Sequence, residues 1–189
     1  SSTSCDGPQV FASSVENATA CGARWFAAAG FGYGWHLFDP RFDLSNAAYA
    51  NESNRFGWVV EIDPNDPKVA PVKRTALGRV KHEGATVVEG RGGRAVVYTG
   101  DDERFEYIYK FVSSKNWKAM RAKGKSPLDE GTLYVAKFDD DGTGQWLELS
   151  PNHPALAGRT MDWILVNTRL AGDLVGATRM DRPEWITRG

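Results

Sequence analysis

The sequence predicts an all-β-dominated, antiparallel fold. Short runs rich in β-branched and aromatic residues recur from Trp58 onward, and turn-forming residues separate them. The expected strands cover residues 58–62, 85–88, 95–98, 107–112, 132–138 and 145–149. Short strands parted by turns are typical of a sandwich, a barrel or a propeller. The pattern alone does not choose among these three.

Two stretches interrupt the strands with helical character. Residues 114–123 are rich in Lys, Ala, Met and Arg, which predicts a short exposed helix or loop excursion. Residues 161–175 have apolar side chains at a spacing close to the helical period. Gly176 would cap this second helix, and Pro183 favours an extended segment after it. The first 38 residues show no lasting period and are expected to be loop with one strand at most.

The acidic run Asp139-Asp140-Asp141-Gly142 could suggest a calcium loop. It lacks the alternating ligand spacing and the closing Glu of an EF-hand. Because two β-rich runs flank it, a hairpin turn explains the run better.

Composition excludes several classes of protein. The chain has 189 residues, of which 41% are hydrophobic and 25% charged, enough for one domain with a core. Its net charge of −1 provides no field that would attract nucleic acid. Two cysteines, Cys5 and Cys21, are too few for a disulfide framework. No apolar run approaches the ~20 residues of a membrane span, so we expect no membrane insertion.

The stretch Leu77-Gly78-Arg79-Val80-Lys81-His82-Glu83 places two cations, an imidazole and a carboxylate side by side. Carboxylate oxygens suit Ca²⁺ and ferric iron, and Arg and Lys side chains donate hydrogen bonds to a phosphoryl oxyanion. Such a cluster could therefore hold a hard metal and a phosphate together. The alternative is a solvated strand end at the surface.

Four further stretches accompany this cluster along the chain, namely residues 54–64, 71–79, 97–111 and 176–185. This ordered set resembles the PhoX-type alkaline phosphatases, secreted bacterial phosphomonoesterases. The resemblance is strong over 39–189 and weak over 1–38. It implies a β-propeller with a Ca²⁺ and Fe³⁺ cluster at its axis. We therefore expect 1–189 to be a single region of propeller-like antiparallel blades with short helical insertions.

The predicted strands make only about one and a half four-stranded blades. We therefore expect an incomplete propeller and an internal piece of a longer protein, or a shortened relative. The remaining blades of the full-length protein would be its partners, since an isolated chain would leave sheet edges unpaired. A periplasmic or secreted location is implied by the resemblance, although the chain shows no signal-peptide pattern.

The resemblance also implies site residues. Glu83 and Asp181 match metal ligands, and Lys81 matches a residue that contacts the phosphoryl group, with Arg79 beside it. Glu83 could instead pair with Arg79 or Lys81, and Asp181 could be a helix-flanking cap. His82 is either a general acid or a packed, hydrogen-bonded residue.

Other carboxylates are less specific. Glu184 is either a ligand or a supporting residue. The run Asp101-Asp102-Glu103 is dense enough for Ca²⁺, yet Arg104 and Lys110 could neutralise it. In the N-terminal segment the family pattern is degraded, so Cys5 as an iron thiolate ligand and Glu16 as a carboxylate ligand depend on a weak match.

The resemblance implies metal-dependent hydrolysis of phosphate monoesters, an alkaline phosphatase activity. This agrees with the absence of a Gly-x-Ser-x-Gly elbow and of a Walker-type phosphate loop. Two alternatives remain: a catalytically inactive, propeller-derived binding module, and a calcium-dependent propeller lactonase. The lactonase would not need Lys81 and Arg79 beside the metal.

Overall fold

The computed structural model describes residues 35–43 and 46–187, and the chain divides into two compact units, Ser1–Phe56 and Gly57–Gly189. The described part of the first unit consists of short 3-10 helices: η3 (Trp35–Leu37), η4 (Pro40–Phe42), η5 (Ala47–Tyr49) and η6 (Glu52–Arg55). The side chains of Asp39 and Asn46 cap η4 and η5 by accepting backbone N–H bonds. These caps satisfy donors that helices this short would otherwise leave unpaired.

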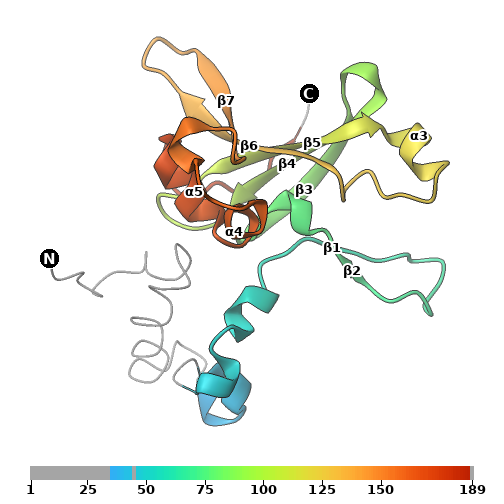
Figure 1. The fold of residues 1–189 in the computed structure, drawn as a ribbon, viewed down its shortest axis with the longest axis vertical. Helices are drawn as coiled ribbons and strands as arrows, with labels where there is room; N and C mark the ends of the chain where they lie inside the picture. Colours follow the sequence, from blue (N-terminus) through green and yellow to red (C-terminus); the bar gives the residue numbers. More distant parts are fainter. Residues whose placement is uncertain (1–34, 44–45, 188–189) are drawn as a thin grey trace, which may run out of the picture. The chain divides into compact units, whose positions relative to one another are not determined.

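The second unit is built on strands β1 (Val60–Glu61), β2 (Val72–Lys73), β3 (His82–Glu89), β4 (Arg94–Asp101), β5 (Ile108–Asn116), β6 (Gly131–Phe138) and β7 (Gly144–Glu148). Its helices are η7 (Thr75–Leu77), η8 (Arg91–Gly93), α3 (Trp117–Arg121), η9 (Pro154–Leu156), α4 (Met161–Val166) and α5 (Thr168–Val175). Strands β3 to β7 form one antiparallel sheet in chain order, and β1 pairs with β2 (Figure 1). Within the described residues, no helix is long and apolar enough to cross a membrane.

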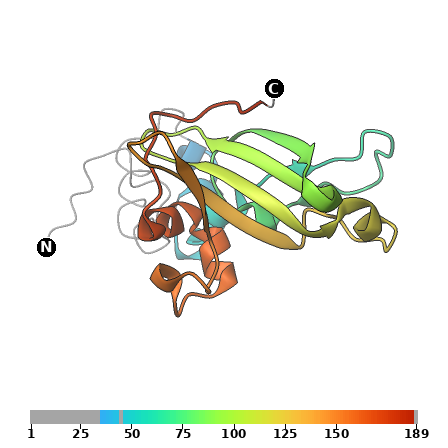
Figure 2. The same cartoon turned by 90° about the horizontal axis from the view of Figure 1, so that it is seen from above.

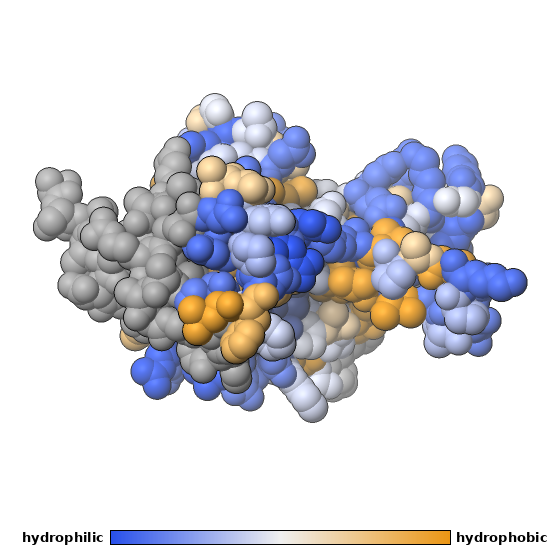
Figure 3. All heavy atoms as spheres, turned by 90° about the horizontal axis from the view of Figure 1, so that it is seen from below, coloured by the Kyte–Doolittle hydropathy of each residue, from blue (hydrophilic) through white to orange (hydrophobic). Residues whose placement is uncertain are grey.

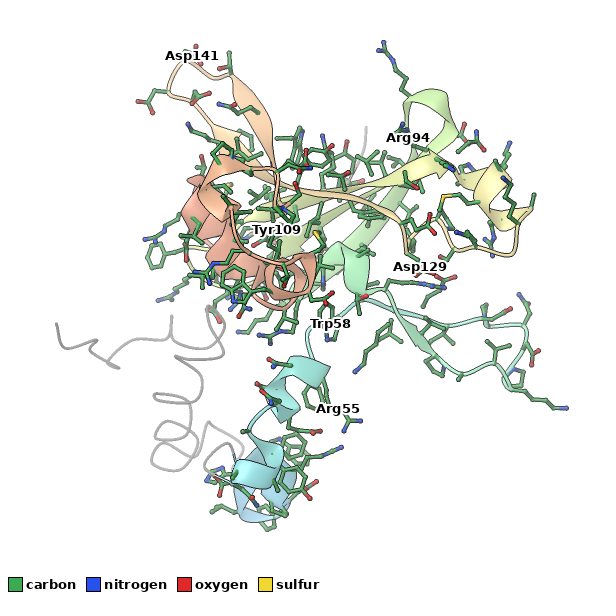
Figure 4. All side chains as sticks on the ribbon, viewed as in Figure 1. Arg55, Trp58, Arg94, Tyr109, Asp129 and Asp141 are labelled. Carbon is green, nitrogen blue, oxygen red and sulfur yellow. The ribbon has the colours of Figure 1, made fainter. Side chains whose placement is uncertain are left out.

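Helices α4 and α5 lie against one face of the five-stranded sheet, which we call the inner face (Figure 2). Alternate strand residues point into this contact, and the large buried ones include Val97, Tyr109, Phe111, Leu133 and Val135. Tyr109 lies at the centre of the unit (Figure 4), fully buried. Burying each such side chain stabilises the fold by about 1.5–3 kcal/mol.

The opposite, outer face of the sheet carries an aromatic group around a lysine. Lys110 Nζ lies 4.3 Å from the ring centre of Trp146 and 5.0 Å from that of Tyr134. Burial lowers the pKa of Lys110. Large apolar side chains also reach the surface of the unit, Ile62 and Val87 among them, and Figure 3 shows an apolar patch on one face of the molecule.

The β-dominated, antiparallel prediction is confirmed, and each expected strand is present with shifted bounds. The predicted helix 114–123 is wrong at its start, because β5 continues to Asn116. The Asn116 side chain then caps α3 by accepting from the amides of Lys118 and Ala119. The turn at residues 139–144 is a hairpin as expected, closed by a 2.9 Å bond from Asp139 N to Thr143 O.

The predicted helix 161–175 is two helices. Asn167, with φ −110° and ψ 44°, breaks the run between α4 and α5. Its amide Nδ2 donates to Trp163 O at 2.9 Å, so the side chain competes with the helical backbone. Gly176 caps α5 in the left-handed region at φ 77°, as predicted.

Candidate active site

The site is built where β3 begins, β4 ends and the C-terminal segment 181–187 crosses both strands. His82 pairs with Asp101 and Glu83 with Gly100 in the antiparallel register. A Cβ on Gly100 would meet the carbonyl oxygens of Pro183 and Glu184, so only glycine allows this close crossing.

Strand alternation sends His82 and Glu83 to opposite faces of the sheet. The His82 ring bonds to Gly78 and Thr99, on the side of the helices. The Glu83 carboxylate instead accepts a hydrogen bond from the indole of Trp185 in the C-terminal segment. The side chains of His82 and Glu83, adjacent in the sequence, therefore lie in two different environments.

The strand ends and the C-terminal segment that meet here carry several charged residues, and we call them the outer charge cluster: Lys81, Glu83, Asp102, Glu103, Asp181, Arg182 and Glu184. Arg182 forks onto Asp102 with two bonds of 2.9 Å. Lys81 Nζ donates to Glu103. Cations and carboxylates thus lie together at one end of the sheet, and Lys81 and Arg182 remain about half exposed.

The ion pairs shift the pKa values of two members of the cluster. Burial tends to raise the pKa of Glu103, but the Lys81 ammonium and the Arg104 amide outweigh it and leave the pKa lowered. The hydrogen bond to Asp102 and its charge raise the pKa of Arg182. Both groups therefore stay ionised at neutral and moderately alkaline pH.

Two residues other than glycine have positive φ here: Phe105 at 67° and Arg182 at 58°. Both adjoin the isolated β-bridge between Arg104 and Asp181. Backbone strain of this kind costs on the order of 1–3 kcal/mol and persists where the surroundings enforce it, often at functional sites. The strain therefore supports the choice of this corner as the candidate site.

His82 lies behind the cluster and is largely enclosed. Its Nε2 lies 2.9 Å from Gly78 O and its Nδ1 lies 3.0 Å from Thr99 Oγ1. Since a carbonyl only accepts, Nε2–H donates to Gly78. Burial lowers the pKa of His82, against opposing contributions from the Gly78 carbonyl and Asp101. Both nitrogens have partners, as in the packed alternative, and the catalytic role of His82 stays a prediction.

Arg79 also points away from the outer charge cluster. Its Nε donates to Val166 O at 2.9 Å, at the end of α4. Burial and the nearby charge of Arg169 lower the pKa of Arg79 to about 10. The structure thus brings Lys81, Glu83 and Asp181 to one end of the sheet and Arg79 to the inner side. Substrate binding by Arg79 stays a prediction.

A buried ion pair supports the corner from the inner side. Arg169 of α5 donates through two nitrogens to the two oxygens of Asp101, each at 2.6 Å. Both side chains are almost fully buried. Glu106 lies 3.6 Å from the same guanidinium, and burial, opposed by Arg169 and aided by Asp101, raises its pKa to about 8.

The described residues do not complete a metal centre. Among residues 35–43 and 46–187, no three His, Cys, Asp or Glu side chains are grouped to hold one ion. Glu83, Asp102 and Glu103 are instead paired with Trp185, Arg182 and Lys81. Cys5 and Glu16 lie outside the described residues. No reaction step through a metal follows from this geometry.

Sequence reasoning missed Arg182 and Arg169, and it named Asp102 only within a possible calcium-binding run. The Asp-Arg-Pro-Glu stretch did contain a signal for Arg182, since a cation sits between two carboxylates there. Nothing in the sequence connects Arg169 with Asp101, because 68 positions separate them.

Two cavities lie away from this corner. One of about 500 Å³ lies near Trp117 and Leu128, and one of about 570 Å³ lies near Arg94 and Tyr98.

Comparisons with known proteins identify the family of this chain. The sequence matches the family described as alkaline phosphatase PhoX over residues 7–188. A search of the curated proteins finds no match. A solved structure, "Pseudomonas fluorescens PhoX in complex with vanadate, a transition state analogue", is 53% identical with a TM-score of 0.73. The likeness covers 84% of this chain and 29% of the solved chain.

This likeness confirms the propeller-like part of the predicted fold class. The family match spans nearly the whole sequence, and the identity to the solved relative is high. The chain therefore belongs to the alkaline phosphatase PhoX family.

Proposed function

We propose that this chain carries part of the active site of a metal-dependent phosphomonoesterase. The observation that supports it most is the outer charge cluster, in which Lys81 and Arg182 lie among carboxylates at a strained corner. The solved relative binds vanadate, a transition state analogue, and the present chain spans 29% of that relative. The activity is accordingly proposed for the full-length protein.

In this proposal, Arg182 and Lys81 bind the phosphoryl group. The guanidinium of Arg182 already makes a fork of two 2.9 Å bonds to the two oxygens of Asp102. A phosphoryl group offers the same arrangement of paired oxygens, so substrate would exchange with Asp102 for this fork. Lys81, which donates to Glu103, would add a point charge.

We also propose Ca²⁺ and Fe³⁺ as cofactors, with Glu83 and Asp181 as ligands from the described residues. Cys5 and Glu16 are proposed to supply the thiolate and a further carboxylate. Cations bound there would polarise the phosphoryl oxygens and activate the attacking nucleophile. This chain's own residues would bind the anionic substrate and hold its phosphoryl group in one orientation.

The proposed substrates are phosphate monoesters, and the proposed location is periplasmic or secreted. The full-length protein would supply the remaining blades as partners. A catalytically inactive binding module and a calcium-dependent lactonase are the competing functions. The position of Lys81 and Arg182 within the cluster favours the phosphatase, because a lactone substrate carries no dianion for two cations to bind.

The full-length protein should hydrolyse p-nitrophenyl phosphate, and a chelator should abolish the activity. Metal analysis of the same preparation should find calcium and iron. Hydrolysis of a lactone with no phosphatase activity would favour the lactonase. Bound metal with neither activity would favour the binding module.

A further inference from the structure

The buried pair between Asp101 and Arg169 has a consequence for the proposed phosphate site. Asp101 Oδ1 accepts from Arg169 at 2.6 Å and also from the backbone N–H of Lys81 at 3.1 Å. One carboxylate therefore connects helix α5 to the residue that carries the exposed cation. Asp101 is fully buried and Arg169 is 2% exposed, so water does not compete for these bonds.

Lys81 needs such support because it precedes the strand. The pairing of β3 with β4 starts at His82, so the sheet ladder does not include Lys81. Its backbone is held by two bonds instead: the N–H donates to the Asp101 carboxylate, and the carbonyl accepts from Asp102 N at 3.0 Å. The first of these bonds depends on the orientation of the Asp101 side chain.

The start of α5 also holds the residues that precede Lys81 in the chain. The amide of Arg79 donates to Thr168 Oγ1 at 3.0 Å, and a Cβ on Gly78 would clash with the same threonine. Thr168 and Arg169 are consecutive, so one turn of α5 contacts Arg79 directly and reaches Lys81 through Asp101. Helix α5 thereby determines the direction in which the Lys81 side chain points.

We propose that Arg169 is a positioning residue of the phosphatase, acting through Asp101 on the backbone of Lys81. This inference rests on the proposed function for its catalytic consequence, though the contact itself does not. Without the guanidinium fork, the Asp101 carboxylate would be left buried with one charged partner fewer and would turn toward other donors. Lys81 would then lose a fixed backbone bond and its ammonium group would sample more positions.

Arg74 offers a matched control. It too is a largely buried arginine with two carboxylate partners, Glu61 at 2.6 Å and Asp129 at 2.7 Å. These partners belong to β1 and to the loop before β6, away from the outer charge cluster. A variant of Arg74 therefore loses two carboxylate ion pairs, to partners more exposed than Asp101, without releasing Asp101 or Lys81.

The test compares Arg169→Lys, Arg169→Met and Arg74→Met in the full-length protein. Amide hydrogen exchange at Lys81 and the separate kcat and KM for p-nitrophenyl phosphate are measured. Lysine keeps the charge but not the fork. We expect Arg169→Lys to speed exchange at Lys81 at least tenfold and to raise KM about tenfold, with Arg169→Met changing both further. Arg74→Met should change neither.

Where Arg169→Met fails to fold, Arg169→Lys decides the question. Unchanged exchange at Lys81 in Arg169→Lys overturns the positioning role, whatever the activity. An equal change in Arg74→Met also overturns it, because the effect would then be general loosening. An inactive wild-type protein would overturn the proposed function, while the exchange comparison would still decide whether Arg169 holds Lys81.

Discussion

Glu106 provides a pH-dependent test of the buried network behind the candidate site. Its side chain is 13% exposed, and Oε2 has no hydrogen-bond partner among the described residues. Burial raises the pKa of Glu106 from 4.5 to about 8, with Arg169 opposing the rise and Asp101 adding to it. Replacing Glu106 by Gln keeps the size of the side chain and removes the titration.

The direction of the change in stability with pH follows from proton uptake by Glu106. Between pH 4.5 and about 8 the folded protein keeps the Glu106 proton while the unfolded chain loses it, so stability falls as pH rises through this window. A shift of one pKa unit corresponds to about 1.36 kcal/mol. The shift of the Glu106 pKa from 4.5 to about 8 therefore lowers the free energy of unfolding by about 5 kcal/mol across this window. Glu106→Gln should therefore gain stability over wild type as pH rises, by up to about that amount.

Urea denaturation at pH 5 and pH 9, followed by tryptophan fluorescence, measures the difference. Glu130→Gln is the control, because that carboxylate is exposed and Lys125 lowers its pKa. The control should show no gain over wild type at alkaline pH. Parallel pH profiles for Glu106→Gln and wild type would refute the reasoning, since they would mean that Glu106 is ionised in the folded protein at neutral pH.

Two further predictions concern the outer charge cluster. Lys81→Ala should lower kcat/KM by roughly tenfold to a thousandfold and weaken inhibition by inorganic phosphate, because one charged stabiliser is lost. Lys125→Ala, which also breaks an exposed pair with a glutamate, should leave both unchanged; equal effects would make the Lys81 ammonium an ordinary surface charge. Gly100→Ala should lower kcat/KM about a hundredfold, since its Cβ would displace the carbonyls of Pro183 and Glu184, and misplacement of about 1 Å can have such an effect. Wild-type kinetics in Gly100→Ala would show that the C-terminal segment does not shape the site.

The strands and the hairpin at residues 139–144 could be predicted because their signals are local. Alternating apolar residues and an Asp-Gly turn act over a few positions. The break at Asn167 could not be predicted in the same way. The apolar period continues through it, and α4 ends where the Asn167 side chain bonds to Trp163 O and Arg79 donates to the carbonyls of Leu165 and Val166.

The sequence predicted site roles for Lys81, Glu83 and Asp181, and the structure places all three at one end of the sheet, while their roles stay predictions. Strand geometry explains the limits of that prediction. Consecutive residues point to opposite faces, so His82 could not accompany Glu83 once both lie in β3. The contact between Arg169 and Asp101 depends on how α5 packs on the sheet, and no short-range pattern encodes that packing.

The central claim is that Glu83 belongs to a metal-dependent phosphatase site, and Glu89 allows a closely matched test. Both glutamates lie in β3 and each accepts a hydrogen bond from a tryptophan indole, Glu83 from Trp185 and Glu89 from Trp117. Only Glu83 lies in the outer charge cluster.

The decisive measurement is p-nitrophenyl phosphate turnover together with bound calcium and iron in full-length Glu83→Gln and Glu89→Gln. An amide cannot supply the anionic charge that these cations require. We expect Glu83→Gln to lose activity and bound metal while Glu89→Gln keeps both. Wild-type turnover and metal content in Glu83→Gln would contradict it.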